Sequence, residues 1–96
     1  MTIEIKKNNQ QTIIEVVGRL DTITAPEFDS FLNDNTAENE NLVIDCDKLA
    51  YISSAGLRIL LSWQKKKKNT MKLINVCELV MEVFEMTGFV DVLTIE

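Results

Sequence analysis

The feature that most constrains the fold of this 96-residue chain is the uninterrupted apolar run Leu42-Val43-Ile44. A strand that is apolar on both faces needs cover on both faces, which is typical of parallel sheets surrounded by helices. A serine-containing helix start at Ser53-Ser54 follows this run, and a second short apolar strand, Met71 to Ile74, follows the helix. A strand, a helix and a further strand in this order predict a right-handed parallel crossover.

The N-terminal part of the chain predicts an antiparallel hairpin. Thr2 to Lys7 alternates polar and apolar residues, and Thr12 to Leu20 is rich in the β-branched residues that favour strands. Asn8-Asn9-Gln10 between them is a turn sequence. A hairpin joined to parallel strands makes the predicted sheet mixed.

Local signals place three helices. In the first, Ala25 to Leu32, Thr24 and Glu27 have the spacing of a capping box, and Pro26 lies in the first turn. The second helix is expected to run from Ser53-Ser54 to about Lys68.

The last helix is expected to begin at Asn75 or Cys77, and Gly88 is placed to end it. The segment through Tyr51-Ile52 is interpreted as a loop, and Val90 to Ile95 as a final edge strand. The expected fold is therefore α/β: one domain over residues 1–96, with an N-terminal antiparallel hairpin and then parallel strands, packed with three to four helices.

Composition excludes several function classes. The net charge of −5 opposes binding to nucleic acids and to anionic membranes, because both require a positive field. The chain has no histidine, which removes Ser-His and Cys-His nucleophile pairs. Cys46 and Cys77 have no CxxC neighbour, so two buried reduced thiols are expected and no metal site.

We expect no catalytic residues and no cofactor. The only carboxylates that could cluster as catalytic groups are Asp21, Asp45 and Asp47, and no general base is expected beside Ser54. A small hydrolase that uses a pair of these carboxylates is the weaker alternative. The first residues lack the apolar core of a signal peptide, and no apolar run has the length of a membrane span. A cytoplasmic protein is expected.

The segment from Tyr51 to Leu61 is the strongest candidate site. It follows a buried strand and opens a helix, at the sheet edge where α/β proteins bind ligands. Ser53 and Ser54 are either helix-capping residues or part of an anion site. Gly56 lies in the first helical turn, where glycine costs about 0.5–1 kcal/mol against alanine, so something is expected to approach the backbone there.

A phosphate on Ser54 would be stabilised by free backbone N–H groups and by the helix dipole. The phosphate would leave the domain folded and place nearly two negative charges on its surface. Asp21, at the end of the second strand, is expected either to bond the backbone of its own turn or to lie beside this helix start.

The same helix carries a wide apolar arc and a lysine run. Ile59 and Trp63 extend the apolar face beyond what a sheet would cover, and they are expected either to pack against the last helix or to form a docking face. Lys65 to Lys68 is interpreted as complementing the negative end of the helix dipole, with lipid or nucleic-acid binding as the weaker alternative.

Four segments together resemble the STAS family, and bacterial anti-sigma factor antagonists within it. They are Gly18-Arg19-Leu20-Asp21, Leu42-Val43-Ile44-Asp45, Tyr51-Ile52-Ser53-Ser54-Ala55-Gly56-Leu57 and Met86-Thr87-Gly88-Phe89. The resemblance spans nearly the whole chain.

The resemblance implies a phosphorylation-gated binding protein that regulates sigma-factor-dependent transcription. The unphosphorylated form would bind an anti-sigma factor, a serine kinase with a GHKL-type ATP fold. Phosphorylation at Ser54 would release it, and a metal-dependent serine phosphatase would reset it. The implied contact residues are Asp21, Thr22, Ser53, Ser54, Gly56 and Arg58.

One departure from the family leaves alternatives open. Many members have an aspartate where this chain has Ser53, so Ser53 is a second candidate phosphoacceptor. Some relatives are not phosphorylated, so a constitutive STAS subunit, for example of a membrane lipid-transport complex, is the alternative function.

Overall fold

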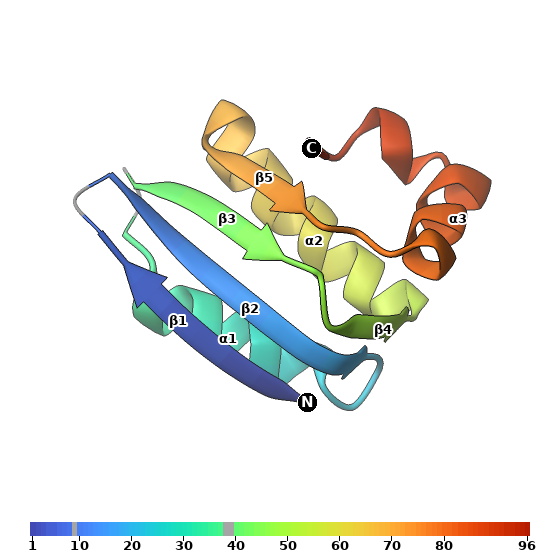
Figure 1. Ribbon diagram of the computed structural model, residues 1–96, viewed down its shortest axis with the longest axis horizontal. Helices are drawn as coiled ribbons and strands as arrows, with labels where there is room; N and C mark the ends of the chain where they lie inside the picture. The colour runs from blue at the N-terminus through green and yellow to red at the C-terminus, as the bar shows by residue number, and fades with distance from the viewer. Residues whose placement is uncertain (9, 38–39) are drawn as a thin grey trace.

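The computed structural model, which describes residues 1–8, 10–37 and 40–96, is built on a mixed sheet of five strands (Figure 1). In four of them the order is β1-β2-β3-β5, and β4 pairs with the end of β2. β1 and β2 are antiparallel, and the other pairs are parallel. The strands are β1 (Thr2–Lys7), β2 (Gln11–Leu20), β3 (Asn41–Asp45), β4 (Leu49–Ile52) and β5 (Met71–Ile74). The predicted α/β architecture with a mixed sheet is confirmed.

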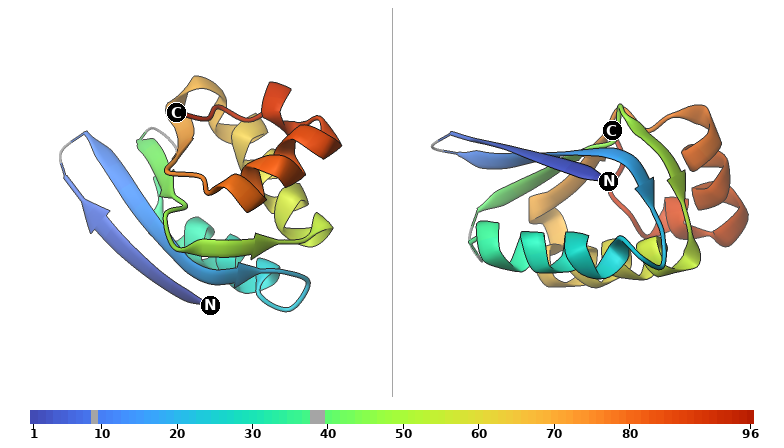
Figure 2. Two further views of the ribbon diagram at one scale, coloured as in Figure 1. Left: turned by 45° about the vertical axis from the view of Figure 1, so that its right-hand side comes forward. Right: turned by 90° about the horizontal axis from the view of Figure 1, so that it is seen from below.

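The helices lie on one face and at one end of this sheet. α1 (Ala25–Asn35) and α2 (Ser54–Lys67) lie side by side beneath the sheet, whereas α3 (Glu78–Thr87) stands beyond its end next to β4 (Figure 2). Two short 3-10 turns, η1 (Lys68–Thr70) and η2 (Phe89–Asp91), follow α2 and α3.

The core forms between the sheet and these helices. Ile14, Ile44 and Leu73 occupy neighbouring positions in β2, β3 and β5, so their side chains leave the same face of the sheet. All three are buried against apolar side chains of the helices. The helical partners include Phe28 and Leu32 of α1, Leu57 and Leu60 of α2, and Val80 and Phe84 of α3.

The segment through Tyr51-Ile52 is a strand, so its interpretation as a loop is wrong. Leu49–Ile52 forms β4 and pairs in parallel with the last residues of β2. Ala50 and Tyr51, the two middle residues of this short strand, are both exposed, so the segment lacks the alternation that marks a strand in sequence. Its conformation is set by pairing with β2.

Helix α1 is longer than expected and begins without the predicted capping box. It extends to Asn35, three residues beyond Leu32. Thr24 precedes the helix but makes no side-chain capping bond. Its hydroxyl instead accepts from the backbone N–H of Asp21 and donates to the carbonyl of Arg19, which fixes the turn before the helix.

The ends of α3 agree only in part with expectation. Cys77 is the N-cap, whereas Asn75 has a left-handed backbone with φ +56° and donates to Asp45 Oδ1. Gly88 ends the helix with φ +81°, as predicted. The predicted edge strand over residues 90–95 is reduced to the turn η2 and one parallel bridge between Leu73 and Ile95. Asn9, the middle of the predicted hairpin turn, lies outside the described residues.

Trp63 packs between the two helices beneath the sheet, not against the last helix as one interpretation had it. Its Nε1–H donates to Asp29 Oδ1 of α1 at 2.7 Å, and the Lys66 ammonium lies 4.6 Å above its ring. Trp63 is buried and Ile59 is half-buried against the core. The wide apolar arc of α2 is therefore covered by α1 as well as by the sheet.

The lysine run is not uniformly solvated. Lys67 is only 5% exposed. Its Nζ donates to the backbone carbonyls of Ala37 at 2.9 Å and Glu40 at 2.6 Å. Lys65, Lys66 and Lys68 are exposed, as expected for residues that complement a helix dipole. Lys67 therefore ties the end of α2 to the segment that leads into β3.

Gly56 allows α2 to pack directly on the end of β2. A Cβ at this position would lie 2.8 Å from Leu20 Cγ, 2.9 Å from Ile52 Cγ1 and 2.9 Å from the Leu20 carbonyl oxygen. The group that approaches the Gly56 backbone is thus the protein's own strand end, which accounts for glycine in the first turn of the helix.

We expect Gly56→Ala to lower the free energy of unfolding by about 1–3 kcal/mol, because a backbone oxygen cannot move aside as a flexible side chain can. Urea denaturation followed by circular dichroism measures this change. Ser62→Ala, on the exposed side of the same helix, is the control and should stay within about 0.5 kcal/mol of wild type. Equal stability of Gly56→Ala and wild type would contradict this packing argument.

Lys67→Met should lower the free energy of unfolding by about 1.5–3 kcal/mol, because methionine keeps an apolar stem but donates to neither carbonyl. The matched control is Lys65→Met, in which an exposed lysine of the same helix is replaced, with an expected change below about 0.5 kcal/mol. Thermal or urea unfolding gives the free energy of unfolding of both variants. If Lys67→Met and Lys65→Met lower it by similar amounts, the two hydrogen bonds of Lys67 do not stabilise the fold.

Candidate functional site

Ser54 is the first residue of α2, and it is exposed. The first intrahelical hydrogen bond runs from the Leu57 N–H to the Ser53 carbonyl at 3.0 Å. The backbone N–H groups of Ser54, Ala55 and Gly56 precede this bond, as in the first turn of any α-helix. The positive end of the helix dipole therefore lies at the Ser54 side chain.

The position of this helix start is set by strand pairing. Leu20, at the end of β2, is the register partner of Ile52, and the Ser53 N–H donates to the Leu20 carbonyl at 2.9 Å. The turn that begins at Asp21 therefore lies beside the start of α2. The sequence left two arrangements open for Asp21, bonding to the backbone of its own turn or a position beside the helix start, and the structure has both.

The two serines have different environments. Ser53 is the N-cap residue, but it makes no side-chain capping bond, so the expected capping role is wrong. Its Oγ is buried and has no hydrogen-bond partner among the described residues. Ser54 is exposed, so of the two hydroxyl groups only that of Ser54 belongs to an open surface residue.

Asp21 organises the turn between β2 and α1. Its Oδ1 accepts from the backbone N–H groups of Ile23 at 3.0 Å and Thr24 at 3.1 Å, and Arg19 Nε lies 3.6 Å from its Oδ2. The hydrogen bond from the Thr24 backbone, with smaller contributions from Ile23 and Arg19, lowers the pKa of Asp21 below its ordinary value. The carboxylate therefore stays charged at neutral pH and holds the turn in place.

The segments that meet at this helix start, the end of β2, the turn after it, β4 and α2, carry several exposed side chains. Ile23, at the tip of the turn, is 86% exposed. Tyr51 on β4 is exposed, with the Arg19 guanidinium 4.1 Å above its ring. Arg58 is exposed and lies four residues after Ser54 in α2, on the same side of the helix. We define the Ser54 surface by its exposed residues Arg19, Thr22, Ile23, Tyr51, Ser54 and Arg58.

This surface overlaps only partly with the residues expected from the sequence. Of the six expected contact residues, Thr22, Ser54 and Arg58 are exposed and belong to it. Asp21 supports its turn, whereas Ser53, whose Oγ is buried, and the buried Gly56 are not part of it. Ile23 was missed, and so was the stacking of Arg19 on Tyr51, although both of these residues stand in segments that the sequence singled out. The signal for Ile23 was an isolated apolar residue in the polar turn Asp21-Thr22-Ile23-Thr24, whereas the pair depends on the strand register, which the sequence does not display.

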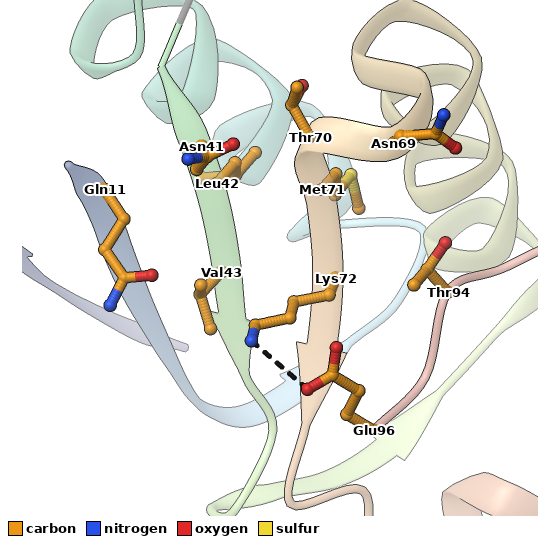
Figure 3. Close-up of a pocket in the computed structure, with 10 residues that line it drawn as sticks. All are labelled: Gln11, Asn41, Leu42, Val43, Asn69, Thr70, Met71, Lys72, Thr94 and Glu96. Atoms are coloured by element: carbon orange, nitrogen blue, oxygen red, sulfur yellow. Dashed lines mark hydrogen bonds and ion pairs between the residues drawn. The ribbon is translucent and has the colours of Figure 1, made fainter.

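A separate pocket of about 260 Å³ lies at the opposite end of the sheet, where β2, β3 and β5 begin (Figure 3). Its lining includes the amide side chains of Gln11 and Asn41 and an ion pair between Lys72 Nζ and Glu96 Oε1 at 3.2 Å. The pocket is remote from Ser54 along the strands, so it forms no part of the Ser54 surface.

Of the two cysteines expected to be buried, Cys46 is buried, whereas Cys77 is only half-buried. Burial, together with the charge of Asp45, raises the pKa of the Cys46 thiol to about 12, so it is not a nucleophile near neutral pH. Among the described residues, histidine, cysteine and acidic side chains form no group of three that could hold a metal ion. Within the same residues, no helix has both the length and the apolar character needed to cross a membrane.

Known proteins with the same architecture include anti-sigma factor antagonists. The Bacillus subtilis (strain 168) protein "Anti-sigma-B factor antagonist" is 24% identical over 99% of this chain and 90% of its own length. A crystal structure of an anti-sigma factor antagonist from Mycobacterium paratuberculosis superposes with a TM-score of 0.86 at 22% identity, covering 98% of this chain and 83% of that one.

SpoIIAA of Bacillus, an anti-sigma factor antagonist, has the same fold in two solved forms. The unphosphorylated form gives a TM-score of 0.75 at 14% identity, over 99% of this chain and 88% of that one. The phosphorylated form gives 0.70 at 13% identity, over 99% and 91%. The family model described as "STAS domain" matches residues 2–96. With nearly its whole length matched, and with the same arrangement of strands and helices, the chain belongs to the STAS domain family.

Proposed function

We propose that this protein is a cytoplasmic anti-sigma factor antagonist whose binding to an anti-sigma factor is switched off by phosphorylation of Ser54. The observation that carries the proposal is the exposure of Ser54 as the first residue of α2, next to the Asp21 turn. The relatives named anti-sigma factor antagonists support it. In this proposal the partner is a GHKL-type serine kinase, a metal-dependent phosphatase removes the phosphate, and the chain itself is a binding module with no catalytic residues.

The Ser54 surface has the composition of a docking site. Ile23 projects an apolar side chain, and burying it in a partner would contribute about 1.5–3 kcal/mol. Tyr51 and Arg19 form a stacked aromatic and cationic pair, and Arg19 lies 3.6 Å from Asp21 of the turn that carries Ile23. Tyrosine and arginine are enriched where partners bind tightly. An exposed apolar side chain together with an exposed tyrosine and exposed arginines supports recognition of a protein surface rather than of a small substrate.

A phosphate on Ser54 would be compatible with the fold. The phosphate oxygens would meet the first-turn N–H groups of α2 and the positive end of its dipole. Arg58, one turn further along the helix, provides a cation on the same side. The similarity of this chain to SpoIIAA in both its unphosphorylated and phosphorylated forms supports the same point, since one architecture is found in both states.

The same phosphate would oppose docking. It adds a charge of about −1.5 to −2 to the Ser54 surface, close to the turn that carries Ile23. A partner that covers Ser54 would have to remove water from this charge or be displaced from the surface, and either effect weakens binding. The switch therefore needs no change of fold, only a change in the surface that the partner contacts.

The environment of the two serines favours Ser54 over Ser53 as phosphoacceptor. A kinase has to bring the γ-phosphate in line with the attacking hydroxyl oxygen. The buried Ser53 Oγ could reach that geometry only if the junction between β4 and α2 opened. Ser54 needs no such opening.

Binding to the purified anti-sigma factor of the same organism should distinguish the effect of a negative charge at position 54 from the effect of losing the Ser54 hydroxyl. We expect Ser54→Asp to weaken binding at least about tenfold, because it places a carboxylate under the partner, and Ser54→Ala to bind nearly as well as wild type. Ser62→Asp, with the same charge on an exposed position further along α2, serves as the control and should bind normally. Isothermal titration calorimetry gives the three affinities. Equal affinities of Ser54→Asp and Ser54→Ala would refute the charge switch.

Intact mass after incubation with ATP and the anti-sigma factor kinase tests the acceptor itself. Wild type and Ser53→Ala should each gain a single phosphate, because the accessible hydroxyl remains, whereas Ser54→Ala should gain none. Phosphate uptake that depends on Ser53 instead would show that the acceptor is wrongly assigned. Absence of uptake by wild type would leave the protein as a constitutive STAS subunit.

A further inference from the structure

The net charge of the chain is concentrated in its last quarter. Residues 73–96 contain five of the fifteen acidic side chains and none of the ten basic ones. The other ten acidic residues are balanced by the ten basic residues of positions 1–72, so the whole net charge of −5 belongs to the C-terminal segment. That segment includes α3, which therefore carries a field of one sign.

The outer side of α3 bears an apolar ridge. Leu79, Val83 and Met86 are spaced by four and three residues, so they form one line along the helix. Leu79 is 57% exposed and Met86 is 88% exposed. The helix packs on the core mainly through Val80 and Phe84, which are buried, and Val83 is half-buried against the same core. Leu79 and Met86 are therefore apolar side chains that the fold leaves exposed, on either side of the half-buried Val83.

An acidic ridge runs next to this apolar one. Glu78, Glu82 and Glu85 each precede a residue of the apolar ridge by one position, so they form a parallel line about 100° around the helix. All three are exposed. We call the two ridges together, Glu78, Leu79, Glu82, Val83, Glu85 and Met86, the α3 surface. In Figure 1, α3 lies at the periphery of the molecule, outside the sheet.

The charges on the α3 surface decide which kind of partner fits it. A second copy of this chain that docked through the same surface would bring two acidic ridges together, which is unfavourable. Anionic lipid headgroups and nucleic-acid phosphates would be repelled as well. A helix whose apolar ridge is flanked by lysine or arginine would match both the apolar and the acidic line.

We propose that the α3 surface is a second docking site, which binds an amphipathic helix of another protein through an apolar ridge flanked by basic residues. Leu79 and Met86 are the apolar anchors, and Glu78, Glu82 and Glu85 pair with the basic side chains. This site does not depend on phosphorylation of Ser54, and it uses none of the residues of the Ser54 surface.

The probe for this site is a synthetic helical peptide of roughly 18 residues, about 27 Å long, with leucines spaced by three and four and arginines on both flanks. A matched peptide has the same leucines and glutamates in place of the arginines. On the isotope-labelled full chain, we expect the arginine peptide to shift the NMR resonances of α3 and to bind at least about tenfold more tightly than the glutamate peptide. Binding should weaken as salt is raised.

Two matched variants separate the α3 surface from the Ser54 surface. Met86 and Ile23 are 88% and 86% exposed, and replacing either by lysine adds the same charge without disturbing the core. Met86→Lys should weaken arginine-peptide binding at least about tenfold, and Ile23→Lys should leave it within about twofold of wild type. For binding to the anti-sigma factor we expect the reverse, a large loss of affinity with Ile23→Lys and little loss with Met86→Lys. The two measurements therefore test the α3 surface and the Ser54 surface separately.

Four outcomes would overturn the proposal. They are equal binding of the two peptides, equal effects of Met86→Lys and Ile23→Lys on peptide affinity, a wild-type dimer in sedimentation that Met86→Lys dissociates, and binding to phosphatidylglycerol vesicles that Met86→Lys abolishes. The third would assign the surface to self-association, and the fourth to a membrane.

Discussion

The parallel pairing of β4 with the end of β2 is the constraint on which the rest of the molecule depends. It places Ile52 beside Leu20 and brings the Ser53 N–H to the Leu20 carbonyl, so α2 has to begin next to the Asp21 turn. Gly56 completes the arrangement, because only a residue without a side chain lets the helix close on the strand at this distance. The surface around Ser54 is thus formed by two chain segments that are far apart in sequence.

Much of the fold could be predicted from local patterns, and the exceptions have physical reasons. The buried strand Leu42-Val43-Ile44, the helix start at Ser54 and the helix end at Gly88 depend on neighbouring residues, and all three are found. β4 depends on a distant partner, and its two exposed middle residues give no alternating signal. Lys67 was misjudged for a similar reason, since its hydrogen-bond partners are contributed by a segment about thirty residues earlier.

The candidate site shows the same division. The sequence located Ser54 and suggested an approach to the Gly56 backbone, but it could not show that the approaching group is Leu20. Nor could it distinguish the two serines, because which hydroxyl is buried depends on how the strand end meets the helix. The acidic character of the C-terminal segment was visible in the sequence. That an apolar ridge lies beside these charges could be seen only from the structure, in which Leu79 and Met86 are exposed.

The contact of Trp63 with Asp29 gives the molecule an internal optical reporter. The chain contains a single tryptophan, and its indole is buried at the boundary between α1 and α2 with its N–H bonded to a carboxylate. Indole fluorescence shifts to longer wavelength when water reaches the ring. Separation of these two helices can therefore be followed by emission spectroscopy without a label, independently of events at the surface that carries Ser54.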